Sequence, residues 1–257
     1  MSEGENESQC IPIFCPVDNV PTVSDTKRAF YKVHTRPINS IYRRVVEELM
    51  VEMHLLSVNV NFKYDPIYAL GVVSSYDRFM QGYRPEADKA SIFRALTGAI
   101  GVEPQQYRQD AQSLESLAAN LSANEAIAVL GGSESPEKAS QLSKIVEEIA
   151  ASEHFKYSRL FAIGLYVFLE LTDPDLVKDE TRLKEALEPI CAKLGILPEK
   201  TQKDLELYRS NLEKMVQAQI VMEDILKADR KKRQEREEAK NAVATPPSDS
   251  PDETTSE

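Results

Sequence analysis

Apolar side chains recur at helical spacing along most of the chain. Most of these stretches begin at a capping residue or a proline, and several end at a glycine. A first short helix is expected from Ser24, as its N-cap, through Phe30 and Tyr31. The longer stretches predicted as helices are residues 38–56, 66–82, 85–101, 104–117, 122–131, 136–149, 155–171, 181–194 and 198–240.

One stretch departs from the helical period. Between Val58 and Tyr64 apolar and polar residues alternate, which is the period of a strand. No second stretch of comparable length could pair with it, so we interpret it as a frayed helix end followed by an extended connection. The predicted fold class is therefore all-α.

The segment from Leu160 to Leu169 is apolar on every side, which is typical of the buried centre of a helical bundle. This run of ten residues is too short to span a membrane, which takes about 20. We expect four regions: a flexible acidic arm (1–20), one multi-helix bundle domain (21–197), a long, partly coiled-coil-like C-terminal helix (198–240) and a disordered acidic tail (241–257).

Composition narrows the possible functions. The chain has 257 residues, of which 42% are hydrophobic, and a formal net charge of -11. Nucleic-acid binding is not expected, since neutralising phosphates needs excess cations. The three cysteines (Cys10, Cys15 and Cys191) suit a reducing compartment. The acidic N-terminus predicts neither a signal peptide nor a transit peptide.

Catalytic and metal-binding motifs are missing from the sequence. It has no glycine-rich phosphate loop, no G-x-S-x-G elbow, no H-E-x-x-H and no C-x-x-C. We expect no catalytic residue, cofactor or metal site. His54 is predicted to be a solvated side chain on the polar face of its helix, and capping explains the serines of the two S-x-x-K matches at Ser24 and Ser135.

A basic, aromatic stretch follows the N-terminal arm, with no acid between Asp25 and Glu47. It is a candidate contact for an anionic membrane surface or an acidic partner. Alternatively, its two adjacent arginines pair with Glu47 and Glu48 on their own helix and the other cations are solvated. The candidate residues are Lys27, Arg28, Lys32, Arg36, Arg43 and Arg44.

The C-terminal helix carries an apolar seam whose members are three and four residues apart, as in a coiled coil. Neighbouring aliphatic residues widen this face, so it suits either docking on the protein's own body or contact with a partner helix. Beyond the seam, residues 227–240 are almost all charged, with seven basic and four acidic side chains. The seam comprises Leu205, Tyr208, Leu212, Met215, Gln219, Met222 and Leu226.

Four segments read together carry a family resemblance: residues 22–31 (TVSDTKRAFY), 36–49 (RPINSIYRRVVEEL), 63–71 (KYDPIYALG) and 76–85 (YDRFMQGYRP). The chain resembles the thylakoid-formation, or photosystem II biogenesis, family of oxygenic phototrophs, over roughly residues 20–226. The expected absence of a transit peptide makes it similar to the cyanobacterial form.

The resemblance implies an all-helical accessory factor without enzymatic activity. It implies a peripheral place on the cytoplasmic side of the thylakoid membrane, with a soluble pool, and a role in photosystem II assembly and repair. It also implies binding and stabilisation of a membrane-anchored AAA protease of the FtsH type, with photosystem II assembly intermediates as further partners. The family has no agreed catalytic residues to carry over.

Two alternatives stay open from the sequence. One is a membrane-surface or pigment-handling protein that acts on photosystem II assembly without binding the protease directly. In this case the apolar run from Leu160 to Leu169 could line a pocket. The other is an enzyme whose site is assembled from distant segments.

Overall fold

The structure is a computed structural model that describes residues 20–133 and 136–243, with side chains through residue 238. Almost all of the predicted arm and most of the predicted tail lie outside the described residues, as do Cys10, Cys15 and Ser135.

The described chain consists of helices and connections, so the all-α prediction is confirmed; no strand occurs within these residues. Residues 58–65 form turns and an extended connection, as expected. The elements are α1 (Val23–Val33), α2 (Ser40–Ser57), α3 (Pro66–Phe79), α4 (Ala87–Gly98), α5 (Pro104–Ala118), α6 (Ala123–Leu130), the 3₁₀ turn η1 (Glu137–Ala139), α7 (Ser140–Ala150), α8 (Arg159–Thr172), α9 (Pro174–Lys178), α10 (Glu180–Leu194) and α11 (Pro198–Val243).

Local capping chemistry sets several helix ends. Asp65 caps α3 ahead of Pro66, and Ser122 forms a capping box with Glu125, both as predicted. Helix α1 forms where it was predicted, but its predicted N-cap, Ser24, was wrong. Its N-cap is Thr22, whose hydroxyl accepts a hydrogen bond from the Asp25 N–H at 3.2 Å, so Ser24 lies inside the first turn.

Two helices begin four residues later than predicted. Helix α8 begins at Arg159, not near residue 155, because the Ser158 hydroxyl accepts a hydrogen bond from the Phe161 N–H at 3.1 Å and caps the helix there. Helix α7 begins at Ser140, after a 3₁₀ turn that follows Pro136.

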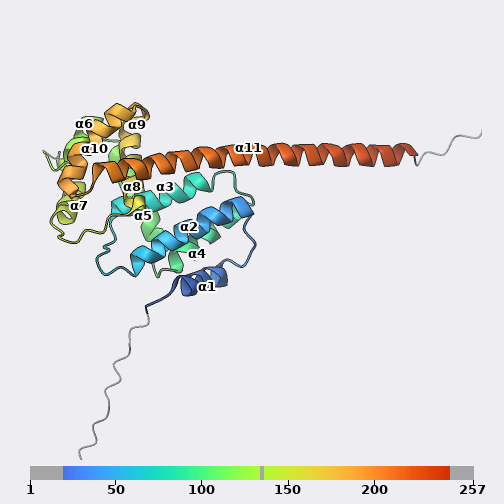
Figure 1. The fold of residues 1–257 in the computed structure, drawn as a ribbon, viewed down its shortest axis with the longest axis horizontal. Coiled ribbons are helices and arrows are strands. Elements are labelled where there is room, and N and C mark those ends of the chain that lie inside the picture. Colours follow the sequence, from blue (N-terminus) through green and yellow to red (C-terminus); the bar gives the residue numbers. More distant parts are fainter. Residues whose placement is uncertain (1–19, 134–135, 244–257) are drawn as a thin grey trace, which may run out of the picture.

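The core is built around α8, whose residues from Leu160 to Leu169 are all buried, as the sequence predicted. Helix α3 packs directly against it, and the two backbones approach closely where Gly71 meets Gly164. Helices α5, α6, α9 and α11 also pack against α8, while α1 covers α2 and α4. The body is therefore a bundle with α8 at its centre (Figure 1).

Helix α11 is longer than the body of the protein. It has 46 residues, which at about 1.5 Å per residue gives about 69 Å. Its first half lies across α3 and α8, and its second half projects away from the bundle (Figure 1). It ends at Val243, three residues beyond the predicted end at Lys240.

Candidate functional site

The six predicted cations lie on α1, on the following loop and on α2, and most of them already have an acidic partner. Lys27 of α1 pairs with Glu47 of α2 at 3.1 Å, and the Tyr31 hydroxyl donates a hydrogen bond to the same carboxylate at 3.3 Å. Arg28 pairs with Asp25 within α1 at 3.1 Å. The pair between Lys27 and Glu47 joins α1 to α2. Both ion pairs reduce the number of cations that are free to contact a partner.

Arg36 holds a structural contact. Its guanidinium donates to the Asp88 carboxylate of α4 at 2.8 Å, and the Asp88 side chain is only 9% exposed. An acid that is this buried needs its partner, since an unpaired buried charge is costly. We therefore assign Arg36 to the connection between α1 and α2, which it ties to α4.

The two adjacent arginines of α2 differ. Arg44 pairs with Glu48 at 3.0 Å, one turn along its own helix, as one sequence alternative expected. Glu47 pairs instead with Lys27, so Arg43 has no acid within ion-pair distance among the described side chains, and the same holds for Lys32. The cationic surface free to meet a partner is thus reduced to these two side chains.

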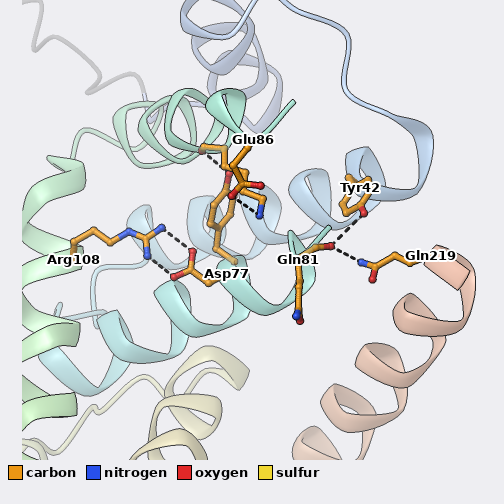
Figure 2. Close-up of polar contacts among 8 residues, drawn as sticks. Tyr42, Asp77, Gln81, Glu86, Arg108 and Gln219 are labelled. Carbon is orange, nitrogen blue, oxygen red and sulfur yellow. Dashed lines mark hydrogen bonds and ion pairs between the residues drawn. The ribbon is translucent and has the colours of Figure 1, made fainter. Parts of the chain in front are cut away.

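The predicted seam of α11 faces the protein's own body over most of its length. Leu205, Tyr208 and Met215 are buried, and Leu212 and Met222 pack partly buried against the same core. Gln219, the polar member, donates a hydrogen bond to the Gln81 carbonyl at 2.6 Å, and Tyr42 donates to the same oxygen at 3.2 Å (Figure 2). Leu226, the last member, is 50% exposed.

Four aliphatic side chains beside the seam of α11 are exposed, as is Leu226, the last member of the seam. Each is at least half exposed to solvent, and they lie within about three turns of the helix, where it leaves the body. Two pairs among them are four residues apart, so each pair forms one row on the helix surface. We call this set the aliphatic segment of α11: Val216, Ile220, Val221, Ile225 and Leu226.

The prediction of a solvated His54 was wrong. Its ring is buried, and its Nδ1 lies 2.8 Å from the Thr26 hydroxyl of α1. Helix α1 covers the face of α2 that carries this histidine. The pair therefore belongs to the contact between the two helices.

The described residues contain no group of three or more His, Cys, Asp or Glu side chains that could hold a metal ion. Burial raises the pKa of the Cys191 thiol, which keeps it in its unreactive form. Burial raises the pKa of Asp65 to about 7, but this carboxyl caps α3 through the Tyr68 N–H at 2.8 Å. Its perturbed titration therefore has a structural explanation.

A groove lies between α2 and α11, with α3 and α8 as its floor. Its volume is about 550 Å³, within the range of about 300–1,000 Å³ that is usual for ligand sites. Leu160 and Ile163 belong to the apolar run that one sequence alternative placed along a pocket. The lining residues outside α8 come from three further segments, which no local pattern could have linked to that run.

These features define a class of all-helical protein. It has a long projecting helix with exposed apolar side chains, and its two N-terminal helices are joined by an ion pair between side chains. The chain belongs to the thylakoid formation protein family, whose sequence model, described as "Thylakoid formation protein", matches residues 22–237. The family resemblance inferred from the sequence is thereby confirmed.

Individual relatives agree with this assignment. Protein Thf1 of Nostoc punctiforme is 58% identical over 232 residues, which cover 90% of this chain and 99% of the relative. Protein Thf1 of Rippkaea orientalis is 52% identical over 236 residues, covering 91% and 99%. The solved structure of Psb29 at 1.55 Å is 43% identical and superposes with a TM-score of 0.72, covering 83% of this chain and 98% of that one.

Family membership implies a role in thylakoid formation and photosystem II biogenesis, and protein partners in that pathway. The family is known as one of accessory biogenesis factors and is not named for a reaction. Within the part of the chain that the structure describes, no helix has both the length and the apolar character needed to cross a bilayer.

Proposed function

We propose that the protein is a non-enzymatic accessory factor that binds a membrane-anchored AAA protease of the FtsH type and stabilises it during photosystem II assembly and repair. In this proposal the aliphatic segment of α11 is the main contact with the protease. Photosystem II assembly intermediates are further partners, reached through the protease complex.

The observation that carries this proposal is the exposure of the aliphatic segment. Contiguous exposed apolar surface usually marks an interaction site, because leaving such side chains in water costs free energy that a partner recovers. The segment lies where α11 leaves the bundle, so a partner can approach it from several sides (Figure 1). A helix that presents apolar residues in this way fits a groove or a helical bundle of a partner.

The charged residues that follow the aliphatic segment can attract and orient an acidic partner. Residues 227–240 carry seven basic and four acidic side chains on a chain whose net charge is -11. The ion pairs seen here are long, such as Lys227 with Glu223 at 3.8 Å and Lys231 with Glu235 at 3.9 Å. Exposed pairs of this kind contribute little, so the excess positive charge stays available to steer an acidic partner.

The test is a strain in which the protein carries Val221→Glu and Ile225→Glu. The proposal predicts that the FtsH-type subunits fall toward the level of a deletion strain, measured by quantitative immunoblotting. The matched control is Leu207→Glu, since Leu207 is an exposed leucine on the first half of the same helix. Protease levels that stay normal in the double variant, with the protein itself present, would contradict the proposal.

We also propose that the protein lies peripherally on the cytoplasmic side of the thylakoid membrane, with a soluble pool. Lys32 of α1 and Arg43 of α2 support this, because neither has an acidic partner among the described side chains. Anionic head groups attract such cations, and salt weakens the attraction. Sedimentation with anionic liposomes should therefore decrease between low and physiological salt, and decrease again when both residues are changed to Glu.

The matched control for this surface is Arg28→Glu, whose cation already pairs with Asp25. If the wild-type protein stays in the supernatant at both salt concentrations, direct adsorption on lipid is excluded and membrane association must come from a protein partner.

A further inference from the structure

The walls of the groove, α2 and α11, are linked near one end by side-chain contacts. There the Asn39 amide contacts the Met222 sulfur at 3.6 Å, and Tyr42 and Gln219 meet at the Gln81 carbonyl (Figure 2). Along α2 the groove extends from Ser40 to Glu52, which is about 18 Å of helix. It is therefore long and narrow.

Most of the groove lining is apolar. On α2, Ile41, Val45 and Leu49 repeat every four residues and so form one continuous row along the wall. The floor and the opposite wall add further apolar side chains: Phe79, Leu160, Ile163, Met215 and Ala218. A ligand that fills this space must present a hydrocarbon surface along its length.

Some of the polar side chains that line the groove have ion-pair partners and others have none. Glu48 is paired with Arg44 at 3.0 Å, and Glu52 is paired with Arg159 at 2.6 Å, so both acids are already neutralised. These four charged side chains cancel one another, so the net charge of the groove lining comes from Lys214.

Several hydrogen-bond donors that line the groove lack such partners. The hydroxyls of Ser75 and Tyr208 are buried and have no hydrogen-bond partner among the described residues. Asn211 and Lys214, one turn apart on α11, make no hydrogen bond or ion pair with other described side chains. Lys214 is exposed and Asn211 lies one turn away, so the α11 wall of the groove presents a cation and an amide to an anionic group.

We propose that this groove binds a single-chain anionic amphiphile of the fatty-acid type. The hydrocarbon chain lies along the apolar row of α2 and the floor. The carboxylate head accepts hydrogen bonds from Lys214 and Asn211 on the α11 wall. A helix about 10–12 Å across would rest above a groove of this volume, whereas one chain fills it.

The test is isothermal titration of the full-length protein with sodium laurate below its critical micelle concentration. We expect saturable binding with one site. Ala218→Phe, which places a ring in the groove from its α11 wall, should abolish binding. Lys214→Glu should weaken it at least tenfold, because the head group then meets a like charge. Helical circular dichroism confirms that each variant is folded.

The matched control is Lys203→Glu, since Lys203 is also exposed on α11 but does not line the groove. It should bind laurate as the wild-type protein does. The uncharged analogue 1-dodecanol should bind at least tenfold more weakly than laurate.

Several results would overturn the proposal. Absence of saturable laurate binding would do so, and would leave the groove as an interface for a protein partner. Equal binding of laurate by the wild-type protein and by Ala218→Phe would place the ligand elsewhere. Equal affinity for laurate and dodecanol would show that the negative charge of the head group does not contribute to binding. Since these variants lie outside the aliphatic segment, protease levels should be unaffected by Lys214→Glu.

Discussion

The crossing of α3 and α8 makes a sharp prediction about Gly71. A methyl group added there would lie 1.8 Å from the Leu160 carbonyl oxygen, and one added at Gly164 would lie 1.9 Å from the Ile67 carbonyl oxygen. Both obstacles are backbone atoms, which cannot rotate away. Because ordinary contact begins near 3.4 Å, Gly71→Ala forces the helices apart by roughly 1.5 Å at the centre of the core.

The size of the effect follows from the packing that is lost. Overpacking a core costs about 1–3 kcal/mol when side chains can adjust, and a backbone obstacle belongs at or above the upper end of this range. We expect Gly71→Ala to lower the free energy of unfolding by about 3 kcal/mol or more. For a chain of this size that corresponds to a decrease in Tm of about 6–12 °C.

The matched control is Gly98→Ala, because Gly98 is the last residue of α4 and an added methyl there meets nothing within 4 Å. It should leave Tm unchanged or raise it, since alanine favours the helix by up to about 1 kcal/mol. Thermal unfolding followed by circular dichroism measures both variants. A Tm for Gly71→Ala within 2 °C of the wild-type value would refute the reasoning about the crossing.

Three further predictions concern single polar contacts. Thr26→Ala leaves the buried His54 ring nitrogen without its partner at 2.8 Å and should cost about 1–3 kcal/mol in urea unfolding, whereas Thr26→Ser should largely keep the contact. The pKa of the Asp65 carboxyl is about 7 in the native state and 3.8 in the unfolded chain. Between these pH values the native state binds the proton more tightly, so the contribution of Asp65 to the free energy of unfolding falls as the pH rises. Asp65→Asn, a neutral cap, should therefore gain in Tm over the wild-type protein between pH 4 and pH 8; a constant difference would contradict this. Gln219→Ala removes the hydrogen bond to the Gln81 carbonyl and should speed amide exchange in the neighbouring turns of α11 by about 2–10-fold, measured by hydrogen–deuterium exchange.

The sequence predicted the helices well because their signals are local. Apolar spacing, the Asp65–Pro66 start and the Ser122 capping box act within one or two turns, and the structure agrees at each of them. The all-round apolar character of α8 also identified the centre of the bundle correctly. The start of α1 was ambiguous for a physical reason: Thr22 and Ser24 are both good caps, and the acid at Asp25 completes a box with Thr22.

Contacts between distant segments explain the remaining differences. His54 lies opposite the apolar row of its own helix, and only the packing of α1 over α2 buries it. The cations could be recognised from the sequence, but the acid that neutralises Arg36 comes from α4, about 50 residues later. No periodicity within one helix contains such information.

The seam of α11 shows the same limit. Its spacing indicates a helix that packs against something, but the spacing is equally suitable for the protein's own core and for a partner. The structure places the seam through Met222 on the body, with Gln219 bound to a backbone carbonyl there. The residues left for a partner are those that widened the face together with Leu226, the last member of the seam, and they make up the aliphatic segment.

The most direct test of the central proposal is an affinity pull-down from gently solubilised thylakoid membranes, read by mass spectrometry. The bait is the tagged full-length protein, compared with its Val221→Glu/Ile225→Glu variant and with the Leu207→Glu control. The account predicts strong enrichment of the FtsH-type protease subunits by the wild-type and control proteins and loss of that enrichment in the double variant. Recovery of photosystem or pigment-binding subunits without the protease would contradict it and make the effect on the protease indirect.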